Sequence, residues 1–436
     1  MKRPKNDTCC SSDEFISPGK GLKGARPPGR ARQLVLCASA LAVVCGYGGA
    51  AQAAPKLKVL FSFVNLKGSN PHASLIKDGA GDLYGATAGG GENSDGVVFE
   101  LTPPAAGKKH WTETVLKAFN GADGNSSLGS LVADAAGNLY GTTDYGGASN
   151  EGVVFQLSPP KGGKKAWAEK VLQSFDGTNG GYPEVGLIAD GAGNLYGTTI
   201  FGGANGDGVV FELSPPKEGK KAWTETVLQT FDGANGQAPT GNLTADGAGD
   251  LYGATEAGGP NGNGVVYELS PPAEGQTDWT ETVLQSFESY APNGSLIVDG
   301  AGNLYGTTAL GGTNGDGSVF ELSPPTGGKT TWTQTVLYSF DGADGNAPFG
   351  GLIKDTAGNF YGTTVGGGAN SWGVAFELSP PKQGKKAWTE KVLQSFDGTN
   401  GKYPEAGLIV DSEGNLYGTT YEGGANDDGV VFKVTP

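Results

Sequence analysis

The chain of 436 residues carries 45 acidic residues against 30 basic ones, which gives a formal charge of −15. Residues 54–436 hold 22 lysines, 42 acidic residues and no arginine, cysteine or methionine, so their charge is −20. An acidic surface without arginine argues against nucleic acid and anionic membranes as partners. Without thiols this part of the chain forms no disulfide, and its stability must come from packing and strand pairing.

Residues 1–53 have the pattern of a secretory signal peptide. Their first 33 residues contain eight basic and three acidic residues, an apolar run extends from Leu34 to Cys45, and Ala51 and Ala53 supply the small residues of a cleavage site. The apolar run is too short to span a bilayer comfortably. We predict cleavage after Ala53, no membrane insertion afterwards, and a secreted or periplasmic protein.

The remainder of the chain is a tandem repeat. A Tyr-Gly pair recurs seven times, with its tyrosine at Tyr84, Tyr140, Tyr196, Tyr252, Tyr305, Tyr361 and Tyr417. The spacing is 56 residues at every step except one of 53, where Phe287-Glu288-Ser289-Tyr290 replaces a longer loop. A repeat of this length is typical of a solenoid or a propeller.

Each copy contains four strand-like runs, which we call A to D. In the third copy they cover residues 186–190, 195–199, 209–213 and 223–231. The runs are rich in β-branched and aromatic residues and are bounded by Gly, Pro, Asn and Asp. No stretch of residues 54–436 has a convincing helical period.

The two ends of residues 54–436 decide between a ring and a linear stack. Residues 58–63 match a D run, while the last copy stops after its C run. Joining them would complete the seventh unit and leave no open sheet edge there. A solenoid would instead need capping repeats at both ends. We therefore predict one all-β domain, a seven-bladed β-propeller with four antiparallel strands per blade, closed by the N-terminal strand.

Two repeated features suggest structural roles. In every copy, run A ends with an aspartate, and a glycine follows three residues later. This pattern predicts a tight hairpin in which the carboxylate accepts hydrogen bonds from backbone N–H groups of the turn. Six tryptophans begin the D runs and suggest packing. Loops such as 205–208 and 341–344 lack the spacing of an EF-hand, so we predict no metal or other cofactor, while a calcium site of another design stays open.

The connections from D to A and from B to C would emerge on one face of a propeller, around the mouth of its channel. Loops on a rigid scaffold are common binding sites, and the residue just before run A differs in every blade except two, which both have glutamate. Aromatic and acidic residues gather in these loops. The candidate ligand-binding residues are His72, Tyr145, Tyr182, Glu184, Phe201, Phe349, Trp372, Tyr403, Glu405 and Tyr421. Trp372 has no aromatic counterpart in the other copies and is expected to be exposed.

Such a surface suits sugar rings or a cationic or polar ligand. The first hypothesis is a non-catalytic binding or scaffold protein whose partner is polysaccharide or another envelope protein. An extracellular lyase or hydrolase is an alternative, although no serine or cysteine nucleophile can be named, and Glu184 and Glu405 would have to span the channel. A structural envelope component is the third hypothesis. We expect a monomer.

The repeat unit D-x-x-G-N-L-Y-G-T-T, followed by G-G-x-N-x-x-G-V-V-F-E-L-S-P-P, resembles the Gloeo/Verruco tandem repeat family of exported bacterial proteins. The resemblance covers nearly all of residues 54–436 and implies propeller-type repeats. Some members carry a C-terminal sorting anchor, which this sequence does not show, so release or retention in the periplasm is expected. The family implies no activity for any residue here.

Overall fold

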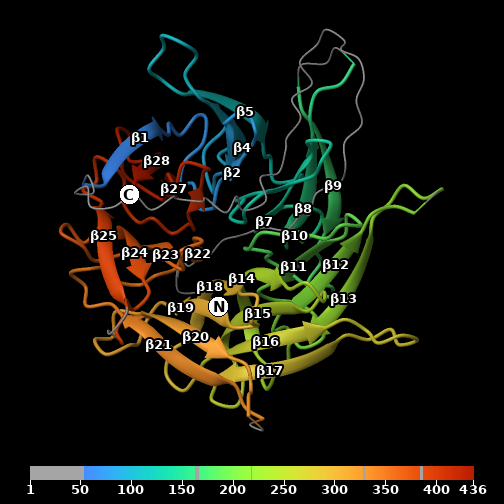
Figure 1. Cartoon of the computed structure of the whole chain (residues 1–436). Coiled ribbons are helices and arrows are strands. Elements are labelled where there is room, and N and C mark those ends of the chain that lie inside the picture. The colour runs from blue at the N-terminus through green and yellow to red at the C-terminus, as the bar shows by residue number, and fades with distance from the viewer. Residues whose placement is uncertain (1–53, 163–165, 218, 328–329, 383–385) are drawn as a thin grey trace, which may run out of the picture.

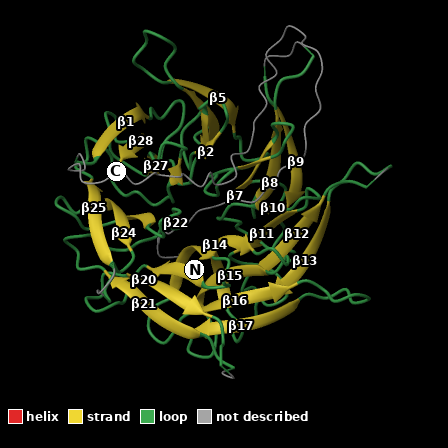
Figure 2. Ribbon diagram, in the orientation of Figure 1, coloured by secondary structure: helices red, strands yellow, loops and turns green. Residues whose placement is uncertain are grey.

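A computed structural model describes residues 54–162, 166–217, 219–327, 330–382 and 386–436. The predicted signal peptide, residues 1–53, lies outside these described ranges. Within them, 28 strands form seven four-stranded antiparallel sheets. Figure 1 shows the sheets arranged as blades around a ring, and Figure 2 shows strands and loops but no helix in the part of the chain that is described.

Blades 1 to 6 hold four consecutive strands each, from β2–β5 to β22–β25, and blade 7 holds β26–β28 and β1. The A strands are β2 (Ile76–Lys77), β6 (Val132–Ala133), β10 (Ile188–Ala189), β14 (Gln237–Ala245), β18 (Pro292–Val298), β22 (Ile353–Lys354) and β26 (Ile409–Val410). The B strands are β3 (Leu83–Ala86), β7 (Leu139–Thr143), β11 (Leu195–Thr199), β15 (Leu251–Ala257), β19 (Leu304–Thr308), β23 (Phe360–Thr364) and β27 (Leu416–Thr420).

The C and D strands form the outer half of each blade. The C strands are β4 (Val97–Thr102), β8 (Val153–Ser158), β12 (Val209–Ser214), β16 (Val265–Ser270), β20 (Ser318–Ser323), β24 (Val374–Ser379) and β28 (Val430–Thr435). The D strands are β5 (Thr112–Ala118), β9 (Ala168–Ser174), β13 (Thr224–Thr230), β17 (Thr280–Ser286), β21 (Thr333–Ser339), β25 (Thr389–Ser395) and β1 (Lys56–Ser62).

The predicted closure of the ring is confirmed. Strand β1 pairs antiparallel with β28, with Lys58 opposite Lys433 and Val59 opposite Phe432. Figure 1 shows the blue β1 beside the red β28. Blade 7 is therefore built from both ends of the described chain, and its sheet edge is covered as in the other blades.

In the third copy the predicted B, C and D strands agree with the structure to within one residue at each end, but the predicted A strand is too long, whereas the A strands β14 and β18 of blades 4 and 5 cover nine and seven residues. The A strand of the third copy was expected over residues 186–190, whereas β10 covers only Ile188–Ala189. The reason is that Gly186 donates its backbone N–H to Oδ1 of Asn242 in the next blade, at 2.8 Å. The innermost backbone thus bonds between blades, where the sequence pattern suggested pairing within one.

Hydrogen bonds in the same layer join further pairs of neighbouring blades. Ser74 donates its backbone N–H to Oγ of Ser130 in blade 2, at 3.0 Å, and its own hydroxyl to the carbonyl of Gly407 in blade 7, at 3.1 Å. In blade 6, Thr363 donates its hydroxyl to the carbonyl of Ala406 in blade 7. These bonds hold the loops above them at fixed positions.

The core consists of apolar clusters that lie between neighbouring sheets. The repeated Tyr-Gly pair serves this packing. A Cβ on Gly197 would lie 2.7 Å from Cζ of Phe211, so only glycine lets the phenylalanine ring of the C strand cross the B strand. The rings of Trp223 and Tyr140, from neighbouring blades, meet at 6.0 Å, which confirms packing roles for tryptophans that begin D strands.

The aspartate that ends each A strand also has the predicted structural role. Oδ1 of Asp190 accepts the backbone N–H groups of Ala192 and Asn194 at 2.9 and 2.8 Å, and Gly193 adopts a φ of +87°. Oδ2 accepts the hydroxyl of Tyr196 at 3.2 Å. One carboxylate therefore fixes both the hairpin and the repeated tyrosine.

Candidate functional site

Each D–A connection lies between the B–C connections of the two blades that it joins, and together these loops form what we call the loop face. Between blades 2 and 3, Tyr182 donates its N–H to the carbonyl of Glu151 at 2.9 Å and accepts the N–H of Ile200 at 3.1 Å. Between blades 6 and 7, Tyr403 bonds in the same way to Trp372 and Tyr421. The loop face is thus tied together by backbone hydrogen bonds between blades.

The two bridging tyrosines have unusual backbone conformations. The φ angle is +58° at Tyr182 and +54° at Tyr403, in the left-handed region that bulky residues seldom occupy. The equivalent residue of four other blades has the same conformation, with φ between +52° and +60°, so it belongs to the repeat and does not by itself mark a binding site; these residues are Asn70, Ser126, Ala238 and Ala347. The conformation sets both tyrosine side chains among the aromatic residues of the adjoining B–C connections.

The junction of blades 2 and 3 brings together four of the ten predicted residues, in what we call the first cluster: Tyr145, Tyr182, Glu184 and Phe201. The Tyr182 ring lies edge-on to Tyr145 at 5.4 Å and to Phe201 at 5.8 Å. Tyr145 and Phe201 remain 38% and 37% exposed. The hydroxyl of Tyr182 lies 3.5 Å from Oε1 of Glu151. The cluster therefore offers exposed aromatic surface beside carboxylate.

The first cluster is strongly acidic. The charge of Asp144, followed by burial and by the charge of Glu184, raises the pKa of Tyr145 to about 12. This phenol therefore remains a neutral hydrogen-bond donor across the physiological range. Hydroxyl and carboxylate groups side by side can donate to and accept from a polar ligand that rests on the rings.

The second cluster lies at the junctions of blades 6, 7 and 1. Trp372 and Tyr403 meet edge-on at 5.2 Å, and Nζ of Lys402 lies 5.2 Å from the centre of the Trp372 ring. The same Nζ lies 2.6 Å from Oδ1 of Asp427 and 3.7 Å from Oε2 of Glu422. A lysine held between a ring and two carboxylates gives this cluster mixed charge.

A histidine–glutamate pair completes the second cluster. Nε2 of His72 lies 2.8 Å from Oε2 of Glu405, and the His72 ring packs edge-on against Tyr421 at 5.6 Å. The His72 side chain is only 5% exposed. Blade 1 contributes His72 and blade 7 the other two residues, so closure of the ring creates this group.

The structure corrects one expectation about an individual residue. Trp372 is half-buried and packs on the blade 7 core, whereas the sequence comparison among copies predicted an exposed side chain. Its neighbour Tyr403 and the core beneath provide partners that no local pattern reveals. Glu184 and Glu405 belong to separate clusters, and the structure gives Glu405 a histidine as its partner. Phe349 is half-buried, at the junction of blades 5 and 6.

Sequence reasoning missed a set of glutamates at the second residue of the D strands. They occupy the same position in five copies and comprise Glu113, Glu169, Glu225, Glu281 and Glu390. Burial is the first cause that raises their pKa values, to about 7 for Glu225 and about 8 for Glu390. Oε2 of Glu225 accepts the side-chain amides of Gln173 and Asn179, from the preceding blade and its loop, at 2.6 and 2.7 Å. The sequence signal that could have revealed this contact is the glutamate that recurs in the D strands together with amide residues such as Gln173 and Asn179 in the preceding blade and its loop.

Within the described ranges, no group of three or more His, Cys, Asp or Glu side chains is arranged to hold a metal ion. A calcium site of another design stays a prediction. No helix among the residues that the structure describes is long and apolar enough to cross a membrane.

Comparison with known sequences gives one family. The model of the Gloeobacter/Verrucomicrobia repeat matches residues 46–191, 165–334 and 292–436. No curated protein matches the chain.

Several solved structures match the chain at low sequence identity. The extracellular domain of a protein assigned as a one-component system from B. thetaiotaomicron is 14% identical, with a TM-score of 0.49, over 84% of this chain and 39% of that one. A Dyadobacter fermentans protein is 13% identical, with a TM-score of 0.45, over 88% and 99%. A puromycin-hydrolysing peptidase of Mycobacterium tuberculosis is 12% identical, with a TM-score of 0.47, over 81% and 50%. No activity is transferred from these structures.

Proposed function

This chain belongs to the Gloeobacter/Verrucomicrobia repeat family, and from that premise we propose that it is an exported, non-catalytic protein that binds carbohydrate with its loop face. The export part of the proposal rests on the leader sequence, and the binding part on the two clusters. The observation that carries it is the group formed by Tyr145, Tyr182 and Phe201, three adjoining rings set beside carboxylates.

The chemistry of the first cluster suits sugars. Aromatic faces pack on the apolar faces of pyranose rings, while carboxylates and phenols exchange hydrogen bonds with sugar hydroxyls. Backbone hydrogen bonds between blades hold Tyr182 before any ligand arrives, so little ordering opposes binding. The second cluster, around Trp372 and Tyr403, gives a second contact for a long chain.

A glycan array with residues 54–436 tests the proposal, followed by titration of any bound glycan. We expect Tyr182→Ala and Phe201→Ala to weaken binding about tenfold each, since an aromatic contact contributes about that factor. Val227→Ala removes an exposed apolar side chain from the outer strand β13 and is the control. If the array stays silent while a pull-down captures an envelope protein through the same residues, the ligand class is wrong. Unchanged glycan binding in both variants would place the site elsewhere.

One observation favours the enzyme alternative. The bond between His72 and Glu405 resembles a histidine base that a carboxylate orients. Burial of the His72 side chain weighs against it, because a general base must reach its substrate. A lyase or hydrolase of this kind predicts that Glu405→Gln abolishes a turnover found in a polysaccharide screen.

A further inference from the structure

The one short step in the repeat coincides with a pocket between blades 4 and 5. Three residues are missing from the D–A connection there, and the remaining segment, Phe287 to Tyr290, lines a cavity of about 300 Å³. None of the ten residues predicted for the loop face lines it. The pocket therefore goes beyond the proposed function and can bind independently of the two clusters.

The missing residues explain how the pocket is built. In the third copy, Gly202 packs against the backbone of the D–A connection. A Cβ on Gly202 would lie within 2.7 Å of backbone atoms of Gly177 and Gly180. In the fifth copy, a Cβ on the corresponding Gly311 would instead lie 2.5 Å from Cδ2 of the Tyr290 ring. Because the longer loop backbone of the other copies is absent here, the Tyr290 ring lies against Gly311 and forms one wall of the pocket.

Two further substitutions fall on the same lining. Gln334 stands where five copies have a buried or partly buried glutamate, and Ser318 stands where six copies have valine. As a result Thr308, whose counterpart Thr199 donates to a loop carbonyl, shares a hydrogen bond with Ser318 at 2.8 Å. The loop deletion and these two substitutions therefore occur at the same junction. Gln334 replaces a charged group and Ser318 replaces an apolar one, so the lining gains neutral polar groups.

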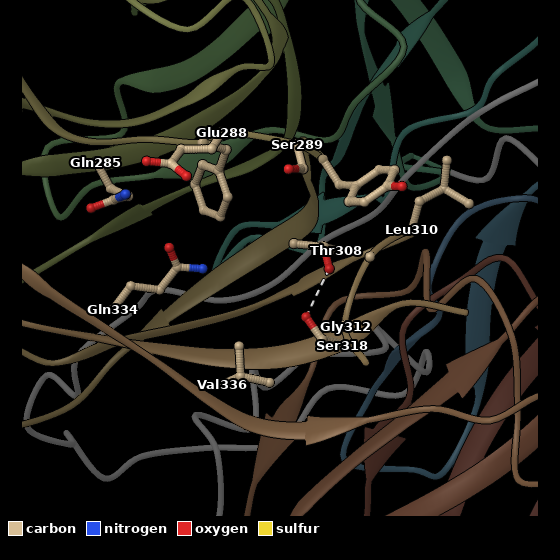
Figure 3. Close-up of a pocket in the computed structure, with 12 residues that line it drawn as sticks. Gln285, Glu288, Ser289, Thr308, Leu310, Gly312, Ser318, Gln334 and Val336 are labelled. Carbon is tan, nitrogen blue, oxygen red and sulfur yellow. Dashed lines mark hydrogen bonds between the residues drawn. The ribbon is translucent and has the colours of Figure 1, made fainter. Parts of the chain in front are cut away.

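The lining combines exposed apolar surface with two side-chain amides. Tyr290, Leu310 and Val336 are 43%, 53% and 51% exposed, which places them among the five most exposed large hydrophobic side chains of the described residues. Figure 3 shows the Gln285 and Gln334 amides at one side of the pocket and Leu310 at the other. Gathered apolar exposure of this kind marks a binding site.

We propose that this pocket binds one neutral pyranose ring of a glycan. Tyr290 supplies the stacking face, and the Gln334 amide can donate to and accept from vicinal hydroxyls. The Gln285 amide donates one N–H to the Ser286 carbonyl at 3.0 Å, which leaves one donor and the acceptor for the sugar. A volume of about 300 Å³ lies at the lower end of ligand pockets, which suits one ring and not a longer segment. Glu288 lines the opening, and the chain is acidic overall, so uronic acids are disfavoured.

The test titrates residues 54–436 with a panel of neutral hexasaccharides and with an oligogalacturonate of equal length. We expect weak binding of a neutral member and at least about tenfold weaker binding of the acidic one. Tyr290→Ala should weaken neutral binding about tenfold. A loop exchange that replaces residues 288–291 with residues 176–182 should fill the pocket and abolish binding there, while melting temperature is maintained.

The two binding proposals fail separately. If Tyr290→Ala and the loop exchange leave neutral binding unchanged while Tyr182→Ala removes it, the pocket proposal is overturned and the loop face stands. Loss through Tyr290→Ala but not Tyr182→Ala supports the pocket alone. A parent protein that binds no neutral member at millimolar concentration, or that prefers the oligogalacturonate, contradicts the pocket proposal.

Discussion

His72 and Glu405 lie 333 residues apart in the sequence, yet Nε2 of the first is 2.8 Å from Oε2 of the second. They occupy equivalent places in the D–A connections of blades 1 and 7, which become neighbours only when the ring closes. The pair therefore couples part of the proposed binding face to the completion of the fold.

This relationship can be measured with a double-mutant cycle. We expect His72→Ala and Glu405→Ala each to destabilise the protein, with a coupling free energy of about 1 to 2 kcal/mol, because the hydrogen bond is shielded from water. Chemical denaturation of the parent, both single variants and the double variant gives the coupling. Additive effects would show that the two side chains do not interact in solution.

The glutamates of the D strands predict an unusual pH dependence. Burial, then the charges of Asp344 and Asp341, raise the pKa of Glu390 from 4.5 to about 8. The folded chain therefore binds more protons than the unfolded chain between these values. The stability that these groups contribute is full below pH 4.5 and is lost as the pH rises through about 7 to 8.

Glu390→Gln tests this pH dependence, because glutamine does not titrate. Blade 5 already has glutamine, Gln334, at the equivalent position. We expect the variant to be more stable than the parent at pH 8.5 by about 1 to 2 kcal/mol, after allowing for partial exposure, and to have a flatter profile. Exposed Glu274→Gln controls for net charge. Equal pH profiles for the parent and Glu390→Gln would contradict the assignment.

The repeat made much of this architecture predictable. Equal spacing, the unmatched D run at residues 58–63 and the Asp–Gly hairpins depend on local sequence, and the structure confirms all three. Contacts between blades were harder to predict from the sequence. The hydrogen bond from Gly186 to Asn242, for example, joins residues 56 apart and replaces pairing within the blade. The exposure of Trp372 was mispredicted for the same reason.

The candidate residues show a similar division. Variation among copies selected Tyr145, Tyr182 and Phe201, and the structure brings them together. The pocket beside Tyr290 was missed although the shortened step was visible, since a deletion in a loop shows where backbone is lost but not what fills the space. Whether these residues bind a ligand remains a prediction.

The N-terminal strand should contribute as much to stability as any other D strand. Phe63 is fully buried and lies 5.0 Å from Phe99, and Phe231 lies 5.2 Å from Tyr267 in the equivalent place. We expect Phe63→Ala and Phe231→Ala each to cost about 3 to 5 kcal/mol of unfolding free energy. A much smaller effect of Phe63→Ala would mean that the first strand is only loosely attached.

The closed ring, which brings His72 to Glu405, requires the two ends of the described chain to complete one blade, and cysteine cross-linking tests this most directly. Residues 54–436 contain no cysteine, so Lys58→Cys with Lys433→Cys introduces a single possible bridge between facing residues of β1 and β28. Glu212→Cys, the counterpart of Lys433 in blade 3, paired with Lys58→Cys is the control. We predict an intramolecular disulfide and a raised melting temperature for the first pair only. Failure of that pair to cross-link within one molecule, or equal cross-linking of the control pair, would contradict the closed ring.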